Sequence, residues 1–249
     1  MADLQIKRKL AEGRIVNILS GVPDPDTIDL VGPLGFDGIW IETEHGPVSW
    51  REIGDYSRAC DLWNMASVVR IPVGEPWVIT RTFDRGASAI VVPHVSDKEA
   101  ATKVAVAAKF GPMGLRGIFY GRRTFGVDDF YNHANEETMV IVLIEEIEAI
   151  NNLAEILEVP NIDVFFVAPG DLAQTMGHTG NTNHPEVQET VDNAIRQIVA
   201  AGRTAGSLAL DGPNQHHYDL GARFFMCHIN SWIIDAATKH LAESAAMEA

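Results

Sequence analysis

Short apolar runs recur at regular intervals along the chain. Each is rich in Val, Ile and Phe and lacks the alternation of polar and apolar residues that marks a strand with one solvent-facing side. Runs of this kind are typical of strands buried on both faces of a parallel sheet. Eight are present, at residues 15–19, 38–41, 67–71, 89–92, 140–144, 164–167, 205–210 and 224–229.

Stretches with a helical spacing of apolar residues lie between most of these runs. They include residues 50–62, 98–109, 148–157, 185–201 and 231–246. Alternating strands and helices predict a parallel sheet, and eight such units in 249 residues match the usual size of a (β/α)8 barrel. A doubly wound sheet would need fewer strands or a longer chain. We therefore predict one α/β domain, a (β/α)8 TIM barrel that spans residues 1–249.

One segment, residues 110–138, does not fit the alternation of strands and helices. It is rich in glycine, aromatic and charged residues and shows no sustained helical period. Long segments of this type between regular elements are usually functional. We therefore predict a long functional loop there.

The composition indicates how large the hydrophobic core can be and in which cellular compartment the protein is expected. Hydrophobic residues make up 46% of the chain, enough for one large core, which excludes a disordered or fibrous protein. The first residues are polar, and no apolar run is long enough for a signal peptide or a membrane span. Cys60 and Cys227 are too few for a disulfide framework or a thiolate zinc site. A cytoplasmic protein is the expectation.

The net charge narrows the range of partners. A formal net charge of −15 repels polyanions, so nucleic acid and anionic membranes are not expected to bind. The same field opposes the entry of an anionic small molecule. A site for such a substrate therefore needs local positive charge, from a bound cation or from arginines.

Polar side chains follow several of the predicted strands where each strand ends. The carboxyl ends of barrel strands meet at one rim, where barrel enzymes carry their reacting groups. We therefore expect these side chains to converge there. They are Glu42, Glu44 and His45 after the second run, Arg70 after the third, His94 after the fourth, Glu145 after the fifth and Asp171 after the sixth.

Glu145 and Asp171 end neighbouring strands and can bind one hard cation, with positions left open for water and substrate. The alternative is that each carboxylate caps a helix or forms an ion pair. The turn APGD, residues 168–171, offers backbone N–H groups beside this cation that can hold a carboxylate, although a plain helix start explains it as well.

Arg70 and His45 are candidates for two further roles, oxyanion stabilisation and proton transfer. The guanidinium of Arg70 can stabilise an oxyanion such as an enolate, or it can form a buried pair with Glu42 or Glu44. His45 can carry a proton near neutral pH, or it can be only hydrogen-bonded. His94 follows a proline and is as well explained as a loop residue. The two histidines of the NQHHY segment, residues 216 and 217, are expected in a surface loop.

At this point the sequence resembles the HpcH/HpaI family of metal-dependent class II pyruvate aldolases, which includes 4-hydroxy-2-oxoheptanedioate aldolase and 2-dehydro-3-deoxyglucarate aldolase. The resemblance covers nearly the whole chain. It lies in GFDGIWIETEHGP around His45, VVRIP around Arg70, DRGASAIVVPHV from Asp84, GLRG, IEEIEAINNLAEIL after Glu145, FFVAPGDLA around Asp171, and DLGARFF.

The resemblance implies roles for these residues. Glu145 and Asp171 would bind Mg²⁺, Mn²⁺ or Co²⁺, Arg70 would stabilise the enolate, and His45 would transfer a proton through water. Asp84 matches an aspartate that orients this histidine, but it precedes the fourth strand and so should lie at the opposite rim of its own barrel. Contact with His45 would then need a neighbouring subunit. The family commonly forms hexamers with an exchanged C-terminal helix, here residues 231–246.

Three departures from the family pattern concern the substrate. Leu143 replaces a glutamine that would contact the oxo acid, Ala168 replaces the glycine before the proline of the GPxD turn, and Glu42 replaces an aspartate. The candidate substrate-binding positions are Leu143 and Ala168, together with Arg70 and Gly170.

The sequence thus predicts an aldolase that joins the enolate of a pyruvate-like 2-oxo acid to an aldehyde, or cleaves the product. Chelation of the oxo acid by a cation lowers the free energy of the enolate. No strand ends in lysine, which disfavours Schiff-base chemistry. Oxaloacetate decarboxylation is the alternative in the same fold. A barrel that binds small acids without turnover is the alternative from another class.

Overall fold

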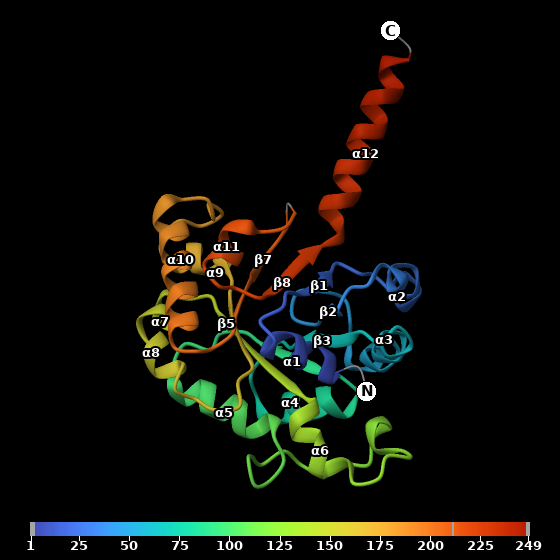
Figure 1. Cartoon of the computed structure of the whole chain (residues 1–249), viewed down its shortest axis with the longest axis vertical. Helices are drawn as coiled ribbons and strands as arrows, with labels where there is room; N and C mark the ends of the chain where they lie inside the picture. Colours follow the sequence, from blue (N-terminus) through green and yellow to red (C-terminus); the bar gives the residue numbers. More distant parts are fainter. Residues whose placement is uncertain (1–2, 211, 248–249) are drawn as a thin grey trace.

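The computed structural model describes residues 3–210 and 212–247 (Figure 1). The eight strands form one closed parallel barrel in the order in which they occur in the chain. They are β1 (Val16–Ser20), β2 (Gly38–Glu42), β3 (Ala66–Arg70), β4 (Ala89–Val92), β5 (Met139–Ile144), β6 (Val164–Val167), β7 (Ala205–Leu208) and β8 (Phe224–His228). The predicted (β/α)8 barrel is confirmed.

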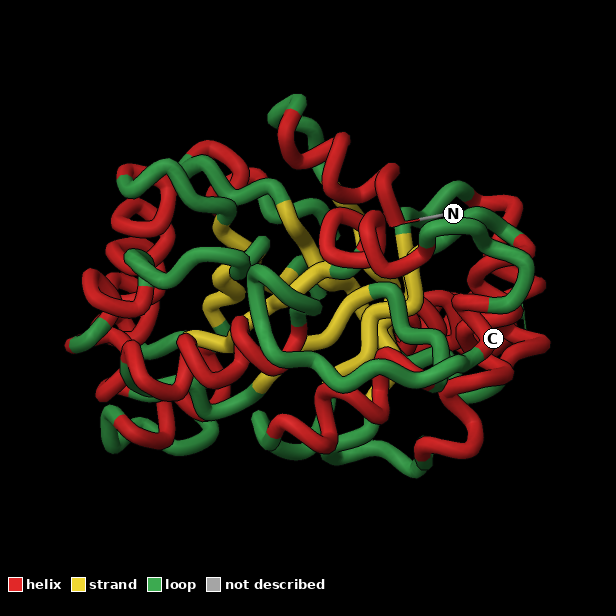
Figure 2. Tube along the Cα trace, turned by 90° about the horizontal axis from the view of Figure 1, so that it is seen from below, coloured by secondary structure: helices red, strands yellow, loops and turns green. Residues whose placement is uncertain are grey.

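Helices enclose the strands on the outside, as the view from below shows (Figure 2). They are α1 (Asp3–Ala11), α2 (Pro25–Val31), η1 (Gly32–Leu34), α3 (Trp50–Leu62), α4 (Pro76–Asp84), α5 (Lys98–Ala108), η2 (Arg122–Thr124), α6 (Phe130–Glu137), α7 (Ile147–Asn151), α8 (Leu153–Ile156), α9 (Pro169–Thr175), α10 (Pro185–Ala200), α11 (Gln215–Asp219) and α12 (Ile229–Ala246). Side-chain caps begin several of them. Asp24 and Asp97 accept backbone N–H groups at α2 and α5, and Ser49 with Glu52 forms a capping box at α3.

Two apolar layers explain why the strand sequences are apolar on both faces. Alternate strand residues, such as Met139, Ile141 and Leu143 of β5, fill the barrel interior, and the intervening residues pack against the helices. Ile6 of α1 joins the interior layer, so α1 covers the barrel at the amino ends of the strands. The carboxyl ends therefore form the accessible mouth.

The predicted long loop at residues 110–138 is wrong in part. The structure contains the 3-10 turn η2 and the helix α6 within this segment. Helix α6 is only eight residues long, so its stability depends on packing rather than on a repeated sequence period. Buried Ala134 anchors it, and Lys109 donates hydrogen bonds to the backbone carbonyls of Asn135 and Thr138.

Smaller differences concern element boundaries. The helix predicted at residues 148–157 is divided into α7 and α8 at Asn152, whose side chain donates to the carbonyl of Ser96. The two histidines predicted in a surface loop lie in the short helix α11, and His217 is buried. The loop prediction is therefore wrong for both histidines, and the prediction of a surface position is wrong for His217.

The C-terminal helix α12 projects away from the barrel (Figure 1). It buries none of its residues within this chain, and Ile233, Ile234 and Leu241 are exposed. Within the described residues, no helix is long and apolar enough to cross a membrane.

Candidate active site

Strand alternation carries polar side chains into the mouth of the barrel. Ile141 and Leu143 face the interior, so Glu145, two residues further along, continues the same face just past the end of β5. Glu42 and Arg70 end β2 and β3 as register partners. The strand-end residues predicted from sequence are therefore brought to one rim.

Arg70 lies between two carboxylates. Its Nε is 2.7 Å from Glu42 Oε2 and 3.2 Å from Glu44 Oε2. The ion pair considered from sequence is thus present, and it involves both glutamates. These two contacts orient the guanidinium, and a fork held in this way can place its remaining N–H groups toward a ligand in the mouth.

Glu42 also shapes the loop that carries His45. Its Oε1 accepts the backbone N–H groups of Glu44 at 2.8 Å and of His45 at 3.0 Å. Thr43 donates to the carbonyl of Arg70 through both its N–H and its hydroxyl. The side chain of His45 is 69% exposed, and its Nε2 lies 3.9 Å from Glu44. This histidine therefore stands at the outer edge of the site, accessible to solvent.

Glu145 is a buried carboxylate, with its side chain only 3% exposed. Burial raises its pKa, the backbone N–H and charge of His94 oppose this, and the charges of Asp171 and Glu44 raise it further. A carboxylate that is desolvated and faces two other carboxylates is stabilised by a nearby cation. Oxygen donors of this type suit hard divalent ions such as Mg²⁺ and Mn²⁺. The residues present therefore fit a metal.

Asp171 reaches this position from the neighbouring strand. In the register of β5 and β6, Ile144 lies opposite Val167, so Glu145 and Ala168 leave the barrel side by side. Asp171 is the third residue of α9, which follows the N-cap residue Ala168, and its charge acts on Glu145. The N–H groups of Gly170 and Asp171 lie in the first helical turn, where no intrahelical acceptor exists. They are available to a ligand anion.

His94 is more closely involved in the site than its sequence context indicates. Its backbone is left-handed, with φ of 56°, and this bend directs its N–H to Glu145 Oε1 at 2.8 Å. Its Nδ1 lies 2.9 Å from Glu146 Oε1, and its Nε2 lies 3.7 Å from Glu44. Partial desolvation would lower the pKa of His94, but the hydrogen bond to Glu146 and three nearby carboxylates outweigh it and raise that pKa. The signal in the sequence was its place at the end of β4.

Two predicted residues lie apart from this cluster. Leu143 is 1% exposed and packs in the barrel interior, so it forms an apolar floor one layer below Glu145. Asp84 ends α4 at the opposite rim, as expected from its place before β4, and pairs with Arg116 at 3.1 Å. Burial raises the pKa of Asp84, partly offset by Arg116. Within this chain, Asp84 does not orient His45.

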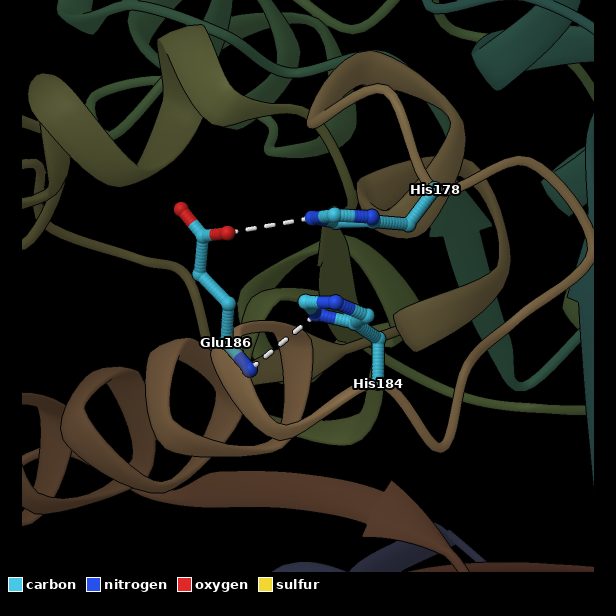
Figure 3. A group of neighbouring side chains, drawn as sticks. All are labelled: His178, His184 and Glu186. Atoms are coloured by element: carbon cyan, nitrogen blue, oxygen red, sulfur yellow. Dashed lines mark hydrogen bonds and ion pairs between the residues drawn. The ribbon is translucent and has the colours of Figure 1, made fainter.

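Two groups of histidines and acids elsewhere have the residue types of metal ligands. In the first, shown in Figure 3, His178 and His184 stack with ring centroids 3.6 Å apart, and His178 lies 3.0 Å from Glu186. His184 Nδ1 accepts the backbone N–H of Glu186 and so caps α10. Imidazole binds metals in the ring plane, and two parallel rings do not direct lone pairs to one point. We therefore assign this group to helix capping.

The second group joins Asp192, His216 and His217. The amide nitrogen of Asn214 can only donate, and it lies 2.8 Å from His217 Nδ1. The proton of the neutral ring is therefore on Nε2, which faces Asp192 at 3.6 Å. Burial lowers the pKa of His217, which favours that neutral form. A protonated nitrogen cannot ligate a metal, so this group connects α11 to α10 instead.

Comparison with known proteins agrees with this arrangement. The family model described as HpcH/HpaI aldolase/citrate lyase matches residues 20–222. The chain belongs to this family. Membership confirms the resemblance seen in the sequence and makes the protein a carbon–carbon lyase of the aldolase type. A barrel without turnover is therefore not supported. Aldolases of this family are generally metal-dependent and act on small molecules.

Individual relatives are similar over most of their length. The hydroxypyruvate/pyruvate aldolase of Roseobacter denitrificans is 35% identical over 224 residues, 88% of each chain. The 4-hydroxy-2-oxo-heptane-1,7-dioate aldolase of Salmonella paratyphi C is 32% identical over 232 residues, 91% of this chain and 88% of that one. A crystal structure of a family member from Burkholderia cenocepacia J2315 has a TM-score of 0.90 at 26% identity and covers 97% of this chain and 99% of that one.

Proposed function

We propose that this aldolase joins a 2-oxo acid of the pyruvate type to an aldehyde, and cleaves the 4-hydroxy-2-oxo acid in the reverse direction. We propose further that Glu145 and Asp171 hold the divalent cation. The observation that carries the proposal is the buried carboxylate of Glu145, on which the charges of Asp171 and Glu44 act, in a mouth that also contains Arg70.

The residues of the mouth have different roles in the proposed reaction. A divalent cation at Glu145 and Asp171 would polarise the carbonyl of the oxo acid and so favour its enolate. Arg70 is oriented by Glu42 and Glu44 to donate to the oxygen that becomes negative. His45, exposed at the rim, takes and returns the proton through water.

The apolar floor below the cation site leaves a second candidate open. Leu143 offers the oxo acid no hydrogen bond, and decarboxylation of oxaloacetate needs the same enolate but no aldehyde. We also propose that the cation is Mg²⁺, Mn²⁺ or Co²⁺, that the protein is cytoplasmic, and that it forms a hexamer. In that hexamer, the exposed apolar residues of α12 would pack on another subunit, and Asp84 would meet the His45 of a neighbour.

Proton exchange at the methyl group of pyruvate tests the proposal without knowledge of the aldehyde. In D₂O, NMR should show loss of the methyl protons only when Mg²⁺, Mn²⁺ or Co²⁺ is present, and excess chelator should stop it. His45→Ala should slow the exchange about 10²-fold or more, since a positioned base contributes that much. Oxaloacetate consumption, measured alongside aldehyde addition, separates decarboxylase from aldolase. Exchange that persists with chelator would contradict the role of the metal.

Leu143→Gln tests whether this position faces the oxo acid. The added amide should change the Michaelis constant for the 2-oxo acid, or the choice among pyruvate, hydroxypyruvate and 2-oxobutyrate, more than it changes metal affinity. The physical reason is that a neutral hydrogen bond contributes about 1 kcal/mol, close to a fivefold effect. Steady-state kinetics with the three acids measure it. Identical kinetics for all three would show that residue 143 does not contact the substrate.

A further inference from the structure

Arg116 is a buried arginine that the proposed reaction does not yet use. It lies in the segment after α5, and its side chain is only 5% exposed. The guanidinium carbon lies 4.7 Å from the ring centroid of Phe83 and 4.5 Å from that of Phe110. These two cation–π contacts hold the guanidinium between α4 and the residues that follow α5.

The backbone around Arg116 is fixed as well. The N–H of Leu115 donates to the carbonyl of Val106 at 2.8 Å, and the N–H of Arg116 donates to that of Lys109 at 2.9 Å. Gly114 permits this close approach, because a Cβ atom there would lie 2.3 Å from the carbonyl oxygen of Val106. The side chain of Arg116 therefore starts from a turn that is packed tightly on α5.

The hydrogen bonding of Arg116 differs from that of an arginine that connects structural elements. Arg203 donates only to backbone carbonyls, among them those of Leu157 and Ile162. Within the described residues, the side chain of Arg116 makes one hydrogen bond, from Nη2 to Asp84 Oδ1 at 3.1 Å, and its buried Nε has no partner. A buried ion pair that leaves a donor unsatisfied is weak evidence for a role in stability. The contact with Asp84 therefore points to another role.

Asp84 is held by one oxygen and leaves the other available. Its Oδ1 accepts from Arg116, whereas Oδ2 has no hydrogen-bond partner in the part of the chain that the structure describes. The side chain is 18% exposed and lines two neighbouring cavities. A group from another subunit can therefore reach Oδ2.

Arg116 also controls the charge of Asp84. Burial raises the pKa of Asp84, and the hydrogen bond and charge of Arg116 lower it. Within the described ranges, no second carboxylate lines the two cavities. Four further arginines line them, and each has a partner elsewhere: Arg58, Arg81, Arg85 and Arg122. Loss of Arg116 would therefore favour the protonated form of Asp84.

We infer that Arg116 is a positioning residue for proton transfer, which fixes Asp84 through Oδ1 so that Oδ2 can accept a hydrogen bond from His45 of the partner subunit. The inference rests on the subunit contact in the proposed function and adds the group that orients the aspartate. The imidazole N–H that faces Asp84 keeps its proton, so the other ring nitrogen takes the substrate proton through water and returns it. Asp84 remains a carboxylate throughout, and Arg116 does not touch the substrate.

Pyruvate proton exchange, measured with Mg²⁺ as a function of pH, tests this inference. Asp84→Asn should slow exchange about tenfold or more, because the histidine loses the group that orients it. Arg116→Met should also slow it and should move the acid limb of the profile about one pH unit upward, since the pKa of Asp84 rises when the neighbouring cation is removed. Arg116→Lys keeps the charge and should bring the acid limb back toward its parental position.

A double variant and a control separate positioning from a structural role. Asp84→Asn combined with Arg116→Met should be no slower than Asp84→Asn alone, because both changes act on one contact. It leaves no unpaired buried charge, so it should unfold close to the parental temperature even if Arg116→Met alone does not fold. Arg203→Met removes an arginine that lies beside Phe165 and binds only backbone carbonyls; it should lower the unfolding temperature and leave the acid limb in place.

The outcomes distinguish this inference from the proposed function. Absence of exchange in the parent would contradict the proposed function, and the inference with it. If Asp84→Asn slows exchange but Arg116→Met keeps the parental rate and acid limb, only the role of Arg116 is overturned. A double variant much slower than Asp84→Asn would overturn it too, and so would an Arg116→Met variant that loses only thermal stability, as Arg203→Met should.

Discussion

Glu145→Gln and Asp171→Asn should each weaken the binding of Mn²⁺ at least 100-fold and abolish aldol turnover. Each substitution removes one of the two carboxylates that we propose as protein ligands, and an amide oxygen is a much weaker donor to a hard cation. The fold should persist, because both side chains lie past the strand ends. The apo form of Glu145→Gln should be at least as stable as the parent, since a buried charge has been removed.

Calorimetric titration with Mn²⁺ and thermal unfolding with and without the ion measure these effects. Glu148→Gln serves as the matched control, because Glu148 is an exposed residue of α7 three positions further along the chain. The parent and the control should gain thermal stability when Mn²⁺ is added, and the two site variants should not. Unchanged affinity in both site variants would exclude Glu145 and Asp171 as the ligands.

Arg70→Lys should lower turnover roughly 10²- to 10³-fold, the size expected for loss of one donor to an oxyanion. Lysine keeps the charge, but it cannot contact Glu42 and Glu44 through one nitrogen and still present a planar fork to the substrate. The loss should appear in kcat, because the oxygen becomes negative only as the enolate forms. Proton exchange should fall in parallel.

Arg196→Lys provides the comparison, since Arg196 is exposed and contacts only its own helix. Its kinetics should match those of the parent. A decrease below threefold for Arg70→Lys, especially with a lowered unfolding temperature, would assign Arg70 a structural role in the loop that carries His45.

Several parts of this protein could be predicted from local sequence. The eight strands are buried on both faces, so each appears as an apolar run, and their alternation with helices indicates the barrel. The residue that follows each run must lie at the carboxyl rim. Glu42, Arg70 and Glu145 were identified in this way because their positions depend only on strand ends and on the alternation of side chains.

Other features depended on contacts between distant segments. Helix α6 is short and is held by Lys109, so its own sequence carries little helical signal. His94 contacts Glu145 through a left-handed backbone bend that no spacing indicates. The burial of His217 likewise requires α11 to lie against β7 and α10.

The junction between β1 and β8 shows the same division. Ser20 and His228 are more than two hundred positions apart, and they become neighbours only because β8 pairs with β1 to close the barrel. Sequence periodicity determined that a barrel forms and which side chains reach its rim, because each strand buries both of its faces. Tertiary structure alone decided which of these side chains meet, because ring closure, backbone bends and burial depend on residues far apart in the chain.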